Sequence, residues 1–339
     1  MRFRNLGGSG LVVSELALGT MVFGEDKARG ATPEDADRMI RRYLEDGGNF
    51  IDTANVYGGG RSEETVGRAL RGRRDDVVLA TKVRFSVGDG RNDAGLSRLA
   101  IMRAVEGCLR RLQTETVDLL YMHSWDPLTP LDESLRAFDD LVTAGKVRYI
   151  GVSNFKAWQV MKALSRSDAA GWVRFVAAQY QYSLVVRDIE PEFVDLCLAE
   201  GVGLVPWSPL GGGFLTGKYR PERRPADPSE GRLATQPERD EEAWHRRATE
   251  RNWRIVEAAT ETAAEMGCSV PQVALAWLLQ RPGVVSVLLG ARTPDQLEDN
   301  LGASSVALPE EARARLDEVS DSDPGYPYRF LTLYGDRTP

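Results

Sequence analysis

The chain alternates short apolar runs with amphipathic stretches, and this repeat restricts its possible folds more than any other feature of the sequence. Eight apolar runs occur, at residues 16–18, 50–51, 77–80, 117–122, 147–152, 175–178, 202–206 and 284–289. Between them, apolar residues recur with helical spacing, as at Ala36, Met39, Ile40 and Tyr43. Strand and helix units spaced roughly 30 to 40 residues apart predict a (β/α)8 TIM barrel of the α/β class, with parallel strands buried on both faces.

Thr-Pro pairs predict where three of the helices begin, because threonine is a good N-cap and proline fits the first helical position. They are Thr32-Pro33, Thr129-Pro130 and Thr293-Pro294. With 339 residues, 42% of them hydrophobic, the chain could also form two smaller domains. An open doubly wound sheet is therefore the alternative fold. Against it, no G-x-G-x-x-G motif follows an early strand with an acidic residue about 20 positions later.

We interpret residues 1–339 as a single barrel domain with three additions. A Gly-Gly-Ser-Gly turn at 7–10 predicts an N-terminal hairpin over 1–14. Residues 211–241 are rich in Gly, Pro, Arg and Glu and are expected to have little apolar core of their own. A loop of this length is either a lid over a ligand at the strand ends or a solvated insertion. Residues 321–339 form a C-terminal tail.

Charge and cysteine content restrict the partners. The net charge is −7 and there is no long basic run, so neither nucleic acid nor an anionic membrane is an expected partner. Three scattered cysteines without a CxxC or Cys/His cluster predict no disulfide framework and no metal site. No leader and no apolar stretch of about 18 residues is evident. We expect a cytoplasmic protein with a small-molecule ligand; the sequence does not predict its oligomeric state.

Four chemically active side chains follow or end successive predicted strands: Asp52, Tyr57, Lys82 and His123. Each alone has an ordinary structural interpretation, as a turn, packing or loop residue. In a barrel, however, the carboxyl ends of the strands meet at one mouth, so the four should converge there. Reduction of a carbonyl by hydride requires such a set, because the resulting alkoxide must gain a proton.

Tyr57 is the expected proton donor of that reaction. A tyrosine with an ordinary pKa near 10 holds its proton firmly, and a Lys82 ammonium beside it should lower that pKa. Asp52 would keep the buried lysine charged. His123 would then donate a hydrogen bond to the substrate oxygen and orient it.

The sequence resembles the aldo-keto reductase family, in particular its larger bacterial members, over about residues 3–316. The motifs that carry the resemblance are Gly19-Thr20, Phe50 to Gly58 with Ser62-Glu63-Glu64, Thr81-Lys82, His123, Gly151 to Phe155, Gln179-Tyr180, Trp207 to Leu210 and Gly290 to Asn300. Asp52, Tyr57, Lys82 and His123 match the catalytic tetrad of that family. The resemblance implies an NADP-dependent oxidoreductase that acts on a carbonyl group by hydride transfer.

It also implies NADPH/NADP+ as cofactor. The polar strand-end residues suit a nicotinamide carboxamide, Trp207 offers a flat face to its ring, the Ser208 loop resembles a pyrophosphate site, and the helix after Thr293 presents free amides to anions. Arg292 is expected to meet the 2′-phosphate. The predicted cofactor residues are Gly19, Thr20, Ser153, Asn154, Gln179, Trp207, Ser208, Pro209, Leu210, Gly212, Lys218, Gly290, Arg292, Gln296 and Asn300.

The substrate is left open as an aldehyde or ketone, with keto-sugars and secondary metabolites among the candidates. Met21, Phe23 and Trp125 are predicted to line an apolar substrate pocket, together with the tail aromatics Tyr326, Tyr328 and Phe330. Two other functions remain under consideration. The family also resembles nucleotide-binding β subunits of channels, which have a membrane partner. A sugar-phosphate isomerase would share the fold, but its Glu and His pair is not evident at the strand ends.

Overall fold

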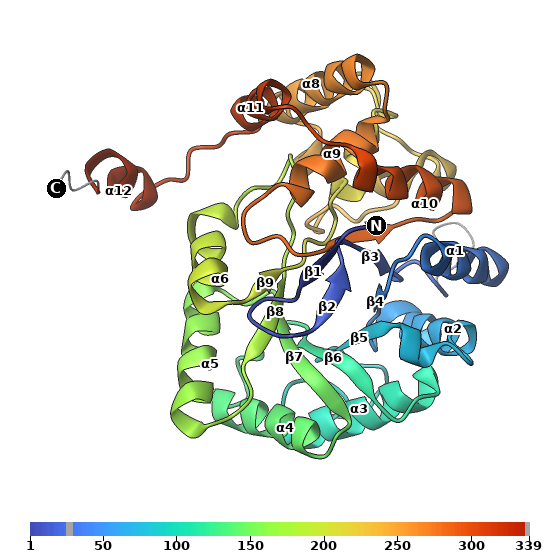
Figure 1. Ribbon diagram of the computed structural model, residues 1–339, viewed down its shortest axis with the longest axis vertical. Helices are drawn as coiled ribbons and strands as arrows, with labels where there is room; N and C mark the ends of the chain where they lie inside the picture. Colours follow the sequence, from blue (N-terminus) through green and yellow to red (C-terminus); the bar gives the residue numbers. More distant parts are fainter. Residues whose placement is uncertain (25–29, 336–339) are drawn as a thin grey trace.

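The computed structural model describes residues 1–24 and 30–335, and its centre is an eight-stranded parallel sheet (Figure 1). The strand order is β10-β3-β4-β5-β6-β7-β8-β9. The strands are β3 (Leu16–Gly19), β4 (Phe50–Asp52), β5 (Val78–Val83), β6 (Val117–Met122), β7 (Val147–Ser153), β8 (Phe175–Gln179), β9 (Gly203–Leu204) and β10 (Val287–Gly290). Their sequence order around the sheet is that of a TIM barrel.

The seam between β9 and β10 closes the sheet into a barrel. Leu204 forms a parallel bridge with Val284 just before β10. The Leu204 amide donates to the Gly283 carbonyl at 2.9 Å, and the Val285 amide donates to the Leu204 carbonyl at 2.9 Å. The predicted (β/α)8 fold is therefore confirmed.

Helices surround the barrel and cover the outer face of its sheet (Figure 1). They are α1 (Pro33–Glu45), α2 (Arg61–Ala69), α3 (Arg98–Leu112), α4 (Leu131–Thr143), α5 (Ala157–Ala170), α6 (Asp195–Glu200), α7 (Trp244–Arg247), α8 (Glu250–Met266), α9 (Val270–Leu279), α10 (Pro294–Leu301), α11 (Glu310–Val319) and α12 (Tyr328–Tyr334). Among the described residues, no helix is both long and apolar enough to span a membrane.

Two of the three Thr-Pro predictions are confirmed. Thr32 caps α1 by accepting a hydrogen bond from the Asp35 amide, and Thr293 caps α10 in the same way. The prediction for Thr129 is wrong. Its hydroxyl donates to Asp126 at 2.7 Å, and α4 begins after Pro130 without a side-chain cap.

A β-hairpin covers the end of the barrel opposite its mouth. Strands β1 (Phe3–Asn5) and β2 (Val12–Ser14) pair antiparallel. Leu6, between them, is fully buried among the apolar side chains of the barrel interior, and the Gly8 amide donates to the Gly201 carbonyl at 2.6 Å. The cavity described below lies at the other end of the barrel, toward the carboxyl ends of the strands.

The long segment 211–241 is more ordered than its composition predicts. It contains three short 3-10 helices, η4 (Gly211–Thr216), η5 (Pro228–Glu230) and η6 (Arg232–Ala234). Phe214 packs against Trp253 with ring centroids 4.6 Å apart, and Tyr219 packs against Trp244 at 5.8 Å. The order of this segment therefore comes from neighbouring helices, because its few aromatic residues dock on α7 and α8. Its interpretation as a lid or as a solvated insertion stays a prediction.

The C-terminal tail leaves the barrel after α11, and α12 projects from it (Figure 1), with one hydrogen bond back to the barrel between the Tyr328 side chain and Glu192. Tyr326, Leu333 and Tyr334 are strongly exposed. Residues 336–339 of the predicted tail lie outside the described residues. The tail aromatics consequently do not contribute to the mouth of the barrel.

Candidate active site

The four predicted catalytic residues meet at the mouth of the barrel. Asp52 ends β4, and Lys82 lies near the end of the adjacent β5. The Lys82 ammonium forms a buried ion pair with the Asp52 carboxylate and donates to the Thr53 carbonyl at 3.0 Å. Its Nζ lies 3.2 Å from the Tyr57 hydroxyl, which the turn after β4 brings back over the strand end. The Asp52 carboxylate, the Lys82 ammonium and the Tyr57 phenol are thus in direct contact with one another in that order.

His123 completes the group from the end of β6. Its ring lies edge-on to the Tyr57 ring, with centroids 5.9 Å apart, and 4.9 Å from the ring of Phe85. The His123 amide donates to the Val83 carbonyl, and its own carbonyl accepts from Asn154 at 2.9 Å. Both backbone groups are thus held, and the contacts with the Tyr57 and Phe85 rings place the imidazole beside the phenol.

Burial controls the charges of this group. Burial alone lowers the pKa of Lys82, but Asp52 and Tyr57 together raise that pKa above its ordinary value. Lys82 therefore keeps its proton. Burial raises the pKa of Asp52, against the opposing effects of Lys82 and Gln179. The pair is best described as a lysine held charged by its neighbours.

The net effect on Tyr57 differs from the sequence-based expectation. Burial raises the pKa of Tyr57 above its ordinary value of 10.0, and the Lys82 ammonium offsets this only in part. The predicted lowering by Lys82 exists as a contribution, but it is outweighed because the phenol is removed from water. Tyr57 is therefore a protonated acid at neutral pH.

A polar network extends the tetrad toward β7 and β8. The Gln179 amide donates to the second oxygen of Asp52 at 2.9 Å. The Ser153 hydroxyl donates to the Gln179 carbonyl at 2.7 Å, and the Asn154 amide donates to the Ser153 hydroxyl at 2.9 Å. The three residues predicted to hold the nicotinamide are thus fixed by one another and by a member of the tetrad.

A cavity of about 790 Å³ runs from Tyr57 and His123 to the start of α10. All fifteen residues predicted to hold the cofactor line it, and so does Met21. Phe23 and Trp125 do not. Phe23 is fully buried below the rim, and Trp125 packs against Phe155 with ring centroids 5.1 Å apart. The cavity size lies within the range of small-molecule and cofactor sites.

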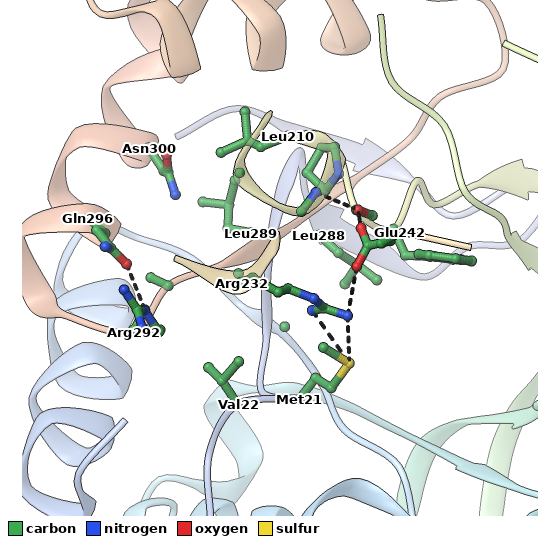
Figure 2. Close-up of a pocket in the computed structure, with 18 of the residues that line it drawn as sticks. Met21, Val22, Leu210, Arg232, Glu242, Leu288, Leu289, Arg292, Gln296 and Asn300 are labelled. Atoms are coloured by element: carbon green, nitrogen blue, oxygen red, sulfur yellow. Dashed lines mark hydrogen bonds and ion pairs between the residues drawn. The ribbon is translucent and has the colours of Figure 1, made fainter. Parts of the chain in front are cut away.

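The far end of the cavity carries the features that a dinucleotide requires. Gly211 to Gly213 have φ angles of 58°, 70° and 90°, a left-handed run that lets the backbone turn tightly around an anion. Lys218 and Arg292 both line the cavity. Burial, together with the positive charge of Arg292, lowers the pKa of Lys218. Figure 2 shows Arg292, Gln296 and Asn300 beside this end of the cavity. An anionic ligand would relieve the repulsion between the two cations.

One ion pair across the cavity was not anticipated from the sequence. Arg232 in η6 pairs with the buried Glu242 carboxylate at 2.7 Å, and Glu242 also accepts a hydrogen bond from the Ser208 hydroxyl. On the other side, an Arg232 Nη lies 3.9 Å from the Met21 sulfur (Figure 2). The segment thereby connects two rims of the cavity. In the sequence, Glu242 is one of several acidic residues in the run 238–242 and carries no distinguishing signal.

Comparison with known proteins agrees with this geometry. The sequence profile described as "Aldo/keto reductase family" matches residues 15–321. The chain belongs to the aldo-keto reductase family. This confirms the resemblance inferred from the motifs and places the chain among oxidoreductases of this fold.

Several relatives match over nearly the full chain. A protein of Oryza sativa subsp. japonica named "Probable voltage-gated potassium channel subunit beta" is 37% identical over 331 residues, covering 96% of this chain and 98% of its own. The norsolorinic acid reductase stcV of Emericella nidulans is 35% identical over 335 residues, with coverages of 95% and 82%. The aryl-alcohol dehydrogenase [NADP(+)] of Phanerodontia chrysosporium is 33% identical over 345 residues, with coverages of 97% and 87%.

Proposed function

We propose that this aldo-keto reductase reduces an aldehyde or ketone to the alcohol, with NADPH as hydride donor and Tyr57 as general acid. The observation that carries the proposal is the Tyr57 hydroxyl, which lies 3.2 Å from the fully buried Lys82, while Tyr57 itself lines the cavity. When bound in the cavity, NADPH would supply a hydride, with its electron pair, for the carbonyl carbon. The carbonyl oxygen takes the proton of Tyr57, so that C=O becomes CH–OH.

The other tetrad residues support this proton transfer. The Lys82 ammonium stabilises the phenolate that remains after Tyr57 gives up its proton, and Asp52 keeps that ammonium charged. Burial, reinforced by Lys82 and Arg84, holds the pKa of His123 well below 6.5, so the imidazole is neutral. Its buried Nδ1 has no acceptor among the described residues, which favours a proton on Nε2 that can be donated to the substrate oxygen.

NADPH is the favoured cofactor because of the cations at the far end of the cavity. Arg292 lies beside the first turn of α10, where free amides also favour an anion. Lys218 supplies a second positive charge close to it. The 2′-phosphate of NADPH, a dianion at neutral pH, can form charge-assisted hydrogen bonds with both. The name of the aryl-alcohol dehydrogenase relative, which includes NADP(+), is consistent with this choice.

The test is a turnover assay that follows NADPH absorbance with aromatic aldehydes, diketones and keto-sugars. Tyr57→Phe is expected to lower turnover by roughly 10²- to 10⁴-fold, the usual effect of losing a general acid, while NADPH affinity stays near that of the parent. Tyr334→Phe, on the exposed α12, is the matched control and should match the parent. Reduction by Tyr57→Phe at the parent rate would require another proton donor.

A nucleotide-binding regulatory subunit is the second candidate function. It is favoured by the full-length match to relatives named as potassium channel β subunits in rice and Arabidopsis thaliana. For this chain it predicts tight NADPH binding with no turnover across the whole substrate panel. The position of His123 beside Tyr57, where it can contact a substrate oxygen, favours the enzyme.

A further inference from the structure

Arg84 has a strained backbone at the mouth of the barrel. It follows β5 two residues after Lys82, and its φ angle is 150°, a conformation that residues with a side chain rarely adopt. The backbone is fixed on both sides of the strain. The Arg84 carbonyl accepts from the Gly95 amide at 2.7 Å, and the next carbonyl, of Phe85, accepts from Asn55 at 2.9 Å. Strain of this kind persists only where surrounding contacts enforce it, and it is concentrated at functional sites.

No ion pair or hydrogen bond holds the Arg84 guanidinium within the described ranges. Its Nε is buried without an acceptor. Asp126, in the loop after β6, could have served as a counter-ion. Its carboxylate accepts from the amides of Leu96 and Leu128 and from the hydroxyl of Thr129. The Arg84 charge only adds to the lowering of the Asp126 pKa that these hydrogen bonds cause, and no ion pair joins the two side chains. The buried Nε is therefore a donor left for another molecule, since a buried donor without a partner is costly.

Ring contacts connect this free cation to the proposed reaction centre. The Arg84 guanidinium lies over the ring of Phe85, 4.9 Å from its centroid, and the same ring lies 4.9 Å from the His123 ring. The Arg84 charge also acts on His123. It contributes to the lowering of the His123 pKa, although burial and Lys82 contribute more. Arg84 is thus one aromatic ring away from the imidazole that would hold a carbonyl oxygen.

We propose that Arg84 is a specificity-determining residue that selects carbonyl substrates carrying an oxyanion, a carboxylate or a phosphate, at a distance from the reacting carbonyl. This inference rests on the proposed reductase function. A guanidinium presents a planar fork of donors that suits either oxyanion. Phe85, which lies between Arg84 and His123, would contact the part of the substrate that separates its two polar ends.

The experiment compares charged and neutral versions of one aldehyde. The parent and Arg84→Met are assayed for kcat/KM with 3- and 4-formylbenzoate, 4-formylphenyl phosphate and the neutral isostere 4-formylbenzamide. Loss of a charged hydrogen bond predicts that the preference for the anionic aldehyde over the amide falls roughly ten- to a hundredfold, with kcat/KM for the amide little changed. If kcat/KM falls more for the formylbenzoates, the carboxylate is the better ligand of Arg84. If it falls more for 4-formylphenyl phosphate, the phosphate is.

Two further variants control for charge and folding. Arg91→Met removes an exposed arginine from the same loop and should leave the preference intact. If the preference for the anionic aldehyde fell equally in Arg91→Met, it would depend on the total positive charge of the loop and not on Arg84, and the proposal would be wrong. Arg84→Gly removes the guanidinium and also relieves the backbone strain, so it should lose the preference without a lower Tm than the parent.

A binding measurement separates this proposal from the reductase function. Calorimetric titration of the parent with 4-formylbenzoate, 4-formylphenyl phosphate and 4-formylbenzamide needs no turnover. Tighter binding of an anionic aldehyde that is lost in Arg84→Met supports the oxyanion site even if no aldehyde is reduced. Equal affinity of the parent for the charged and neutral aldehydes would overturn the proposal, whatever the turnover assay shows.

Discussion

Arg292 and Lys218 place two positive charges close together at the far end of the cavity, and their effect can be measured one residue at a time. Arg292→Ala is expected to weaken NADPH binding roughly ten- to a hundredfold, since a charged hydrogen bond to the 2′-phosphate is lost. NADH affinity should hardly change. Titration of both cofactors checks this, with the exposed Arg41→Ala on α1 as control. An equal loss for both cofactors, or tighter NADH binding by the parent, would contradict the assignment.

The pKa shifts of Tyr57 and His123 predict a flat pH profile for carbonyl reduction. The pKa of His123 lies well below 6.5, so the neutral imidazole is retained as the pH falls to about 6. The pKa of Tyr57 lies above 10.0, so the acid form persists as the pH rises to about 9. We therefore expect kcat/KM to be constant over this range. A loss of rate on the acid side near pH 6.5 would show that His123 titrates normally.

Single residues differ in how well the sequence predicts them. Asp52, Lys82 and His123 could be placed because each lies at a strand end, and parallel strands bring those ends together. Phe23 could not, because it lies beyond β3, where the alternation of side chains no longer fixes direction. Arg84 was not singled out for a similar reason, since a left-handed backbone gives no signal in the sequence.

At the scale of elements, the segment 211–241 combines an anchored beginning with a part that reaches across the cavity. Phe214 and Tyr219 dock on neighbouring helices, whereas Arg232 is held to the cavity rim by its ion pair with Glu242. Local opening that breaks this ion pair would expose the bond after Arg232, so we expect trypsin to cut there when NADPH is absent and much more slowly when it is bound. Mass spectrometry of a digestion time course measures both rates.

The same digest contains its own control. Arg329 lies in α12, away from the barrel, so cleavage after it should proceed at one rate with and without NADPH (Figure 1). Unequal rates at Arg329 would reveal an effect of NADPH on the protease. Equal cleavage after Arg232 in both conditions, with cofactor demonstrably bound, would make the segment a solvated insertion instead of a lid.

Element boundaries show where pattern alone is insufficient. The apolar run 284–289 predicts one strand, but its first part bridges to Leu204 and only Val287–Gly290 pairs with β3. The run 202–206 is likewise a strand only at Gly203–Leu204. An apolar run indicates that its residues are buried. Whether they form a strand depends on backbone hydrogen bonds to a neighbouring strand, and few of these form at the seam between β9 and β10. Similarly, Thr129 is a residue type that often caps helices, but here its hydroxyl donates a hydrogen bond to Asp126 instead.

For the whole molecule, the N-terminal hairpin contributes to stability without touching the reaction centre. Leu6 is fully buried in the barrel interior, so Leu6→Ala should lower the free energy of unfolding by about 2 to 5 kcal/mol. Phe3→Ala, on the exposed side of the hairpin, should change it by about 0.5 kcal/mol or less. Urea denaturation measures both. Equal effects of the two substitutions would show that the hairpin does not seal the barrel.

The hairpin also makes contacts with residues that are synthesised much later than its own. Arg4 donates to the Val284 carbonyl at 2.7 Å and to the Leu279 carbonyl at 2.8 Å, across sequence separations of 280 and 275 residues. During translation, these acceptors leave the ribosome long after Arg4. Contacts between such distant residues form slowly because a long loop must first be closed. The segment around Arg4 therefore cannot complete its docking until residues 279–284 have been synthesised.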